Sequence, residues 1–184
     1  MFSLANRVQK LSNQTLTAFS VITVAVVLVS VVQLYLAGAH NIASTAIENV
    51  RASALLKHLR SFGAAGRPKE NSRIMFDLSA DLTPLFHWNT KQVFVYLTAE
   101  YAGRKEGQSS RVTYWDAILT SPTDAVLDMR NVRAKYSVWD TEASFRGRNA
   151  TLRLEWSVQP YVGAFLTGET TTQVPFTFAS VKKK

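Results

Sequence analysis

The chain of 184 residues contains no cysteine, and it has no formally charged side chain between Lys10 and Glu48. The missing cysteines exclude disulfides, thiol catalysis and most structural zinc sites, so packing alone must hold a folded domain together. Glycine and proline are scarce, at eight and five residues. Because no linker rich in proline, glycine and serine divides the chain, one domain is expected after the uncharged region.

The uncharged region contains an apolar run from Leu16 to Leu36. As a helix that rises about 1.5 Å per residue, this run spans roughly 32 Å, about the thickness of the hydrocarbon core of a bilayer. It predicts a transmembrane signal-anchor helix over residues 16–38. Ala37-Gly38-Ala39 has the small-x-small pattern of a cleavage site, so a cleavable signal peptide is the second interpretation, although its apolar region is normally shorter. A buried helix of a soluble protein is the third, disfavoured by the many Val, Ile and Thr residues.

The charges that flank the run predict its orientation. Arg7 and Lys10 precede it without an acidic residue, whereas Glu48 and Arg51 after it cancel. The positive-inside rule therefore places residues 1–15 in the cytosol as a short N-terminus and the bulk of the chain across the membrane.

The part beyond the membrane is expected to be a membrane-proximal connector over residues 39–71 and a lumenal domain over residues 72–184. Both helical and alternating spacings occur near the start of the connector, so a strand there, with a domain that begins near residue 47, stays open.

Apolar and polar residues alternate after residue 71, which predicts strands. The expected strands are residues 73–79, 93–100, 112–119, 135–140, 152–159 and 173–179. Turn signals separate them at residues 103–107, 121–124, 147–149 and 167–168, and a short helical turn is expected within residues 81–89. Pro175 marks the last strand as an edge strand or a bulge. The predicted fold is mainly β: a single N-terminal transmembrane helix followed by an antiparallel β-sandwich lumenal domain, with four tryptophans suited to its core.

The net charge of +8 does not indicate nucleic-acid binding. About +6 of it belongs to the part after the apolar run, where basic residues are scattered singly and face a compartment without nucleic acid. A solvated surface is the simplest interpretation, and contact with a membrane surface is a weaker one. The tail Lys182-Lys183-Lys184 is expected to be a frayed basic end.

No catalytic, cofactor-binding or metal-binding residue is predicted. His40, His58 and His87 lack the spacing of metal ligands, and the sequence has no Gly-x-Ser-x-Gly and no glycine-rich phosphate-binding motif. From these residues alone, two functions stay open: a type II membrane hydrolase or transferase, and a type II membrane protein whose lumenal domain binds cargo or glycans.

One modification motif is present in the predicted lumenal domain. Asn149-Ala150-Thr151 forms an N-glycosylation sequon at a predicted turn, just before the strand that begins at Leu152. A second sequon begins at Asn13, on the side of the helix predicted to be cytosolic. We therefore expect a glycan on Asn149 and none on Asn13.

The block from Phe76 to Tyr101, which contains Phe86-His87-Trp88-Asn89-Thr90, resembles the signal peptidase complex subunit 3 family in its fungal, yeast-like form. Further similarity lies at Trp115-Asp116, Lys135-Tyr136-Ser137, Trp139-Asp140, the turn near Asn149, and Trp156-Ser157-Val158-Gln159-Pro160. The early membrane span is similar too, so the resemblance covers nearly the whole chain.

The resemblance implies a single-pass, type II protein of the endoplasmic reticulum membrane with its bulk in the lumen. It also implies a non-catalytic partner, in a hetero-oligomer with other small subunits, of the serine protease that removes signal sequences from secretory and membrane precursors. No cofactor is implied. A subunit that stays beside the protease has to keep its own signal-like segment, which weighs against cleavage after Ala39.

Four aromatic residues are candidates for the partner interface, because aromatic side chains are enriched at buried contacts. They are Phe86, Trp88, Phe94 and Tyr96. For each of them a place in the core of the sandwich is the competing interpretation.

Overall fold

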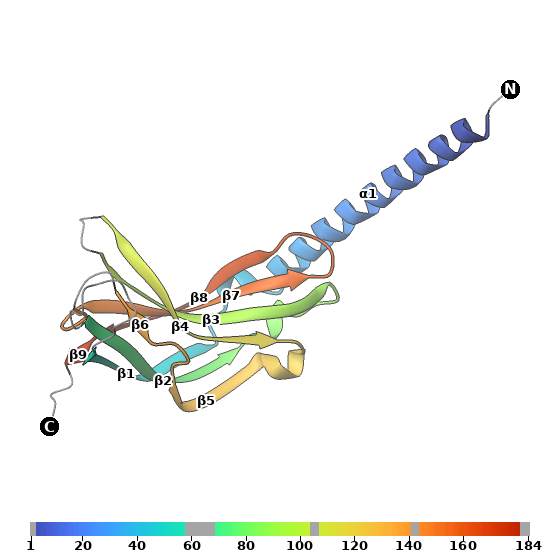
Figure 1. The fold of residues 1–184 in the computed structure, drawn as a ribbon. Helices are drawn as coiled ribbons and strands as arrows, with labels where there is room; N and C mark the ends of the chain where they lie inside the picture. The colour runs from blue at the N-terminus through green and yellow to red at the C-terminus, as the bar shows by residue number, and fades with distance from the viewer. Residues whose placement is uncertain (1–2, 58–68, 104–106, 141–143, 181–184) are drawn as a thin grey trace.

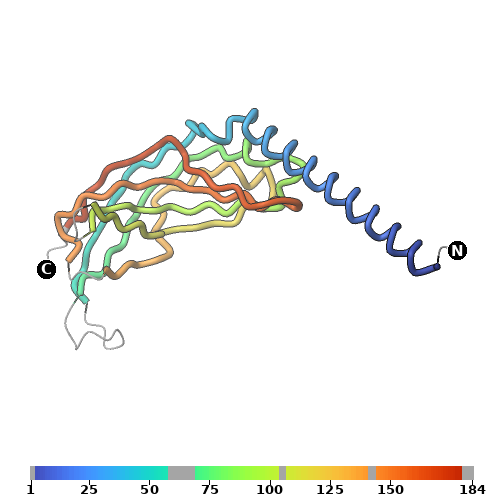
Figure 2. The backbone as a smooth tube through the Cα atoms, turned by 90° about the horizontal axis from the view of Figure 1, so that it is seen from above, coloured from blue at the N-terminus to red at the C-terminus, as the bar shows by residue number. Residues whose placement is uncertain are grey.

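The computed structural model describes residues 3–57, 69–103, 107–140 and 144–180. One long helix is followed by two packed β-sheets, and the helix projects from one end of the sandwich (Figures 1 and 2). The elements in chain order are α1 (Leu4–Leu36), η1 (Ala39–Asn41), β1 (Thr45–Lys57), β2 (Lys69–Asp81), η2 (Thr83–Leu85), β3 (Thr90–Ala102), β4 (Ser109–Leu119), η3 (Pro122–Ala125), β5 (Val126–Arg133), β6 (Val138–Trp139), β7 (Asn149–Pro160), β8 (Leu166–Thr177) and β9 (Ala179–Ser180).

The helix α1 extends beyond the apolar run at its amino end. It begins after Ser3, whose hydroxyl oxygen accepts a hydrogen bond from the Asn6 amide at 3.4 Å, and it ends before Gly38, whose φ of 79° is left-handed. Four hydroxyl side chains donate to the carbonyl four residues earlier, so they carry no unpaired donor into lipid. They are Thr15, Thr17, Ser20 and Thr23. Among the described residues, α1 is the one helix long and apolar enough to cross a membrane.

The first sheet has the order β5-β2-β1-β9, with β6 also paired to β2, and the second has the order β4-β3-β7-β8. All described pairings are antiparallel except β1–β9. Each sheet turns one face to the core, as alternation requires. The buried apolar side chains of the long strands include Ile47, Ala52, Ala54, Ile74, Phe76, Leu78, Ala80, Val93, Val95, Leu97, Ala99, Leu152, Leu154, Trp156 and Val158. The predicted fold class is confirmed.

Most predicted strands are confirmed, with three corrections. The strand β5 was not expected, and the strand predicted at residues 135–140 contracts to the two residues of β6. The turn predicted at residues 167–168 is wrong, because both residues lie in β8 and the chain reverses at residues 161–165. The expected helical turn is η2, and Pro175 lies on β8, an edge strand of its sheet.

A carboxylate on the central strand β2 stabilises irregular backbone in both neighbouring strands. Asn49 of β1 and Asn131 of β5 have positive φ angles of 49° and 52°, and the pairing register shifts near both. Asp77 accepts 2.6 Å hydrogen bonds from the Asn49 side-chain amide and the Asn131 backbone amide. The bond from Asn131, and then that from Asn49, lowers the pKa of Asp77 below its ordinary value.

The end of the sandwich away from α1 is held by a buried carboxylate. Glu70, which is 3% exposed, accepts hydrogen bonds from the backbone amides of Phe145 at 2.7 Å and Arg146 at 3.2 Å. Its other oxygen pairs with the Arg146 guanidinium. Phe145 is fully buried and packs edge-on against Tyr101 and at a tilt against Phe178. Glu70 therefore ties this loop to an aromatic cluster.

Candidate functional site

The end of the sandwich nearest α1 is attached to the helix by a set of contacts that we call the junction. The junction consists of Ser30 and Gln33 of α1, residues 86–89 between η2 and β3, and residues 161–165 between β7 and β8. Figure 1 shows the β7–β8 turn beside the last turns of α1. Three segments far apart in the sequence therefore meet where the membrane helix joins the domain.

Asn89 connects all three segments of the junction. Its side chain is 2% exposed and donates to the Ser30 hydroxyl at 3.0 Å and to the Val162 carbonyl at 2.8 Å. Its side-chain oxygen accepts from the Val162 amide at 3.0 Å, and its backbone carbonyl accepts from the Tyr161 amide at 2.8 Å. One buried amide thus satisfies the backbone of the β7–β8 turn and binds the helix.

His87 adds a second polar contact to the same helix residue. Its Nδ1 accepts a hydrogen bond from the Asn89 amide at 3.0 Å, and its Nε2 lies 3.3 Å from the Ser30 hydroxyl. Burial lowers the pKa of His87 below its ordinary value, which favours the neutral ring. A neutral ring that accepts at Nδ1 carries its proton at Nε2 and donates it to Ser30.

Two further contacts fix the direction of α1. The indole N–H of Trp88 donates to the Gln33 side chain. Gly163 has a φ of 121°, and a β-carbon there would lie 3.1 Å from a methyl carbon of Val27, so glycine suits both the backbone and the close approach. Val27, Ser30 and Gln33 are spaced three residues apart and share one helix face. The sandwich therefore holds a single face of α1 over two turns.

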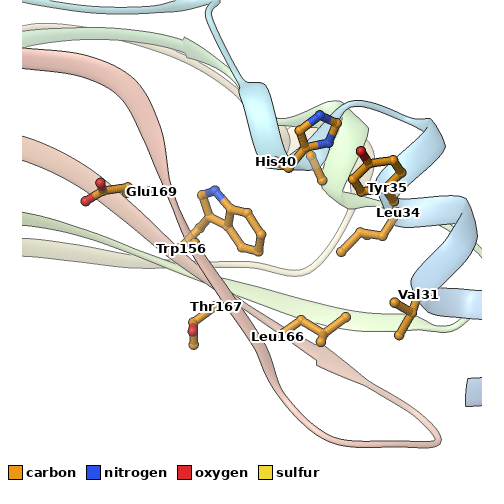
Figure 3. Close-up of a pocket in the computed structure, with 10 residues that line it drawn as sticks. Val31, Leu34, Tyr35, His40, Trp156, Leu166, Thr167 and Glu169 are labelled. Atoms are coloured by element: carbon orange, nitrogen blue, oxygen red, sulfur yellow. The ribbon is translucent and has the colours of Figure 1, made fainter.

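A cavity of about 360 Å³ lies between the end of α1 and the second sheet. Its lining residues are Val31, Leu34, Tyr35, Ala39, His40, Trp156, Leu166, Thr167, Gly168 and Glu169. Figure 3 shows Trp156 reaching from β7 towards the helix end, with the Glu169 carboxylate turned away. The walls are mostly apolar, and Tyr35 stacks on His40 with ring centres 4.4 Å apart.

Trp156 explains why the Thr167-Gly168 pair is not a turn. A β-carbon on Gly168 would lie 2.3 Å from the Trp156 ring, so glycine makes room for the indole within a regular strand. The indole is 4% exposed, and its N–H has no partner among the described residues.

The four predicted interface residues do not form one surface. Phe86 is half-buried against the core, and Trp88 is at the junction with 56% of its surface exposed. Phe94 and Tyr96 lie on the face of β3 that points away from the core, stacked with ring centres 5.2 Å apart. Ile118 pairs with Phe94 from β4 and is 58% exposed. We call Phe94, Tyr96 and Ile118 the outer patch.

A ladder of charges crosses the same face beyond the outer patch. Arg111 of β4 lies 3.3 Å from Glu100 and 3.4 Å from Glu155, and Arg153 of β7 lies 3.2 Å from Glu100 and 3.3 Å from Glu169. Burial and the charge of Glu155 raise the pKa of Tyr96. The charges alternate in sign across four strands, so they pair with one another within the chain. They border the outer patch directly, because Asp116 and Glu155 are the cross-strand partners of Tyr96.

Asn149 is exposed at the first residue of β7, at the end of the sandwich opposite the junction. The preceding turn contains Gly147 with a φ of 70°, and the Thr177 hydroxyl donates to the Asn149 side chain at 2.8 Å. The sequon is therefore accessible in the folded domain.

The histidines do not converge. His40 lines the cavity, His87 belongs to the junction, and His58 lies outside the described residues. In the part of the chain that the structure describes, no group of three His, Asp or Glu side chains is placed to hold a metal ion.

An apolar helix long enough to cross a membrane, packed at its end against an antiparallel β-sandwich, is the architecture of a membrane-associated protein whose bulk is a β domain. The family model described as signal peptidase subunit matches residues 1–181. Two proteins named signal peptidase complex subunit 3 match all of this chain: that of Debaryomyces hansenii is 49% identical with 97% of its length covered, and that of Saccharomyces cerevisiae is 44% identical with 100% covered. The human protein of the same name is 35% identical over 66% of this chain and 69% of its own length.

The chain belongs to the signal peptidase subunit family. The resemblance identified from the Phe76–Tyr101 block is therefore confirmed, and the higher identities to the yeast proteins agree with the fungal form.

Proposed function

We propose that this chain is a non-catalytic subunit of the endoplasmic reticulum signal peptidase complex, where a serine protease on another chain cleaves signal sequences. Membership of the family over nearly the whole chain supports this, and the comparisons do not favour a separate cargo- or glycan-binding protein. The structural observation that carries the proposal is the junction. A sandwich that is held on one face of a membrane helix keeps a bound protease at a fixed height above the bilayer.

We further propose a type II orientation, with the sandwich in the lumen. Arg7 and Lys10 lie at the free end of α1, far from the sandwich, which suits a cytosolic end under the positive-inside rule.

The proposed contact for the protease subunit is the outer patch. Phe94, Tyr96 and Ile118 present uncharged surface on a rigid central strand and its neighbour, and aromatic residues on such surfaces form the anchors of protein interfaces.

Placing a carboxylate in the outer patch should separate this chain from the complex. We expect Ile118→Asp to lose co-purification of the protease subunit in mild detergent, because an unpaired charge would be buried at the contact. Val126→Asp is the matched control, since Val126 is a β-branched residue on β5 with 61% exposure against 58% for Ile118. Both variants should keep the parent's thermal unfolding midpoint. Equal recovery of the protease with both would show that the outer patch is not the contact.

Substituting the sequon asparagine tests orientation directly. In cells, Asn149→Gln should remove one glycosidase-sensitive mobility shift, because Asn149 is exposed on the lumenal side of our proposal. Asn13→Gln should leave mobility unchanged, since Asn13 is placed in the cytosol. If Asn13→Gln removed the glycosidase-sensitive mobility shift and Asn149→Gln kept it, the sandwich would lie in the cytosol, opposite to our proposal.

A further inference from the structure

Two segments at the end of the sandwich that holds α1 carry no charged side chain. The chain has no charged side chain from Trp156 to Gly168, which includes the β7–β8 turn, and His87 is the one titratable residue between Leu82 and Thr90. Four large side chains there are exposed. They are Tyr161 at 68%, Phe165 at 65%, Trp88 at 56% and Val162 at 37%. Such a concentration of exposed apolar surface marks an interaction site.

We propose that the β7–β8 turn, residues 161–165, together with Trp88, inserts into the bilayer leaflet nearest the sandwich. This contact with lipid goes beyond the proposed function and does not depend on it. It would give the domain a second point of attachment beside α1.

The length of α1 places the turn at the level of the bilayer. The apolar run begins at Leu16, and the sandwich first contacts the helix at Val27. The stretch between them, residues 16–26, rises roughly 16 Å at about 1.5 Å per residue, whereas the hydrocarbon core is about 30 Å thick. Residues from Val27 onwards therefore complete the span, and the turn packed against Val27 lies at the depth of the leaflet. A tilted helix would bring the turn deeper.

Three backbone groups at the start of the turn have partners within the protein. The Tyr161 amide donates to the Asn89 carbonyl, and the Val162 amide and carbonyl both bond to the Asn89 side chain. A backbone group in lipid has to find its partner within the protein, and Asn89 supplies three such bonds to the turn.

The side chains match the chemistry of a membrane surface. Trp88 and Tyr161 have an apolar ring and a polar group, the combination enriched at membrane–water interfaces, while Phe165 and Val162 are suited to the acyl chains. A partner protein is less well supported, because the apolar surface is continuous with the membrane helix itself.

The absence of cysteine permits a direct test with single labels on the full-length chain. Nitroxide labels would be placed by Phe165→Cys, by Val24→Cys in the middle of α1, and by Gln108→Cys at the opposite end of the sandwich, in phosphatidylcholine vesicles. Frequent collisions of the nitroxide with oxygen indicate that the label lies in lipid. Frequent collisions with a water-soluble nickel chelate indicate that it lies in water. We expect the label at 165 to prefer oxygen, like that at 24, and the label at 108 to prefer nickel.

A label at 165 that is as accessible to nickel as the label at 108 would overturn the proposal. Shielding of position 165 from both reagents in the purified complex would also overturn it, in favour of a protein contact. Unfolding midpoints equal to that of the cysteine-free parent show that each labelled chain is folded. A further variant, Tyr161→Cys, repeats the measurement at the same turn if Phe165→Cys fails to fold.

Discussion

Replacing Glu70 with alanine is expected to lower the free energy of unfolding of the sandwich by about 1–3 kcal/mol, the cost of leaving a buried hydrogen-bonding group without its partner. The change leaves the buried Phe145 amide without its acceptor and the Arg146 guanidinium without its carboxylate. Phe145 would then lose its fixed place against Tyr101 and Phe178. The measurement is urea unfolding of the full chain in detergent, followed by tryptophan fluorescence.

Two matched variants separate the bonds of Glu70 from its charge. Glu70→Gln keeps an acceptor oxygen for the Phe145 amide but loses the ion pair. Its free energy of unfolding should therefore lie between that of the parent and that of Glu70→Ala. Glu48→Ala removes an exposed carboxylate from β1 and should change stability by less than about 0.5 kcal/mol. Equal midpoints for Glu48→Ala and Glu70→Ala would mean that the buried carboxylate does not hold the loop.

Alternation predicts β3 and β7 well because these two strands pair with each other in a regular register over residues 93–100. Residues 93–100 and 152–159 lie in the paired strands β3 and β7, where every second side chain enters the core. Alternation failed for β5 because Asn131, with its positive φ, shifts the register within a short strand. Asn49 does the same in β1, which is why helical and alternating spacings coexist there. A bulge adds one residue and reverses the face of every residue after it.

The junction could be predicted only in part. The block that carries the resemblance includes Phe86–Thr90, and Trp88 is among the predicted interface residues, but the sequence does not indicate that Trp88 contacts the helix of its own chain. Asn89 was not singled out because its partners Ser30 and Val162 are 59 and 73 positions away, with no periodicity to connect them. The Thr167-Gly168 signal misled because a glycine that makes room for a side chain looks the same in sequence as a turn glycine.

Replacing Asn89 with alanine is expected to free the sandwich from α1 while leaving its core intact. The substitution leaves the amide and carbonyl of Val162 without their side-chain partner, at a cost of about 1–3 kcal/mol for each unsatisfied group, while Ser30 keeps its contact with His87. Spin labels introduced by Val24→Cys and Gln108→Cys in the full chain would measure the distance between helix and sandwich. The distance distribution should broaden clearly in Asn89→Ala.

The controls for this last prediction lie at the same end of the molecule. Asn41→Ala changes an exposed asparagine of η1 and should leave the distribution narrow. Asn89→Asp keeps the acceptor for the Val162 amide but loses both side-chain donors, so it should broaden the distribution, though less than alanine does. If the proposed function holds, cells that depend on Asn89→Ala should accumulate uncleaved precursors even though the sandwich folds, because the protease is then held at a variable height. A narrow distribution in Asn89→Ala would mean that Trp88, Gln33 and the close approach of Gly163 to Val27 suffice to fix the helix.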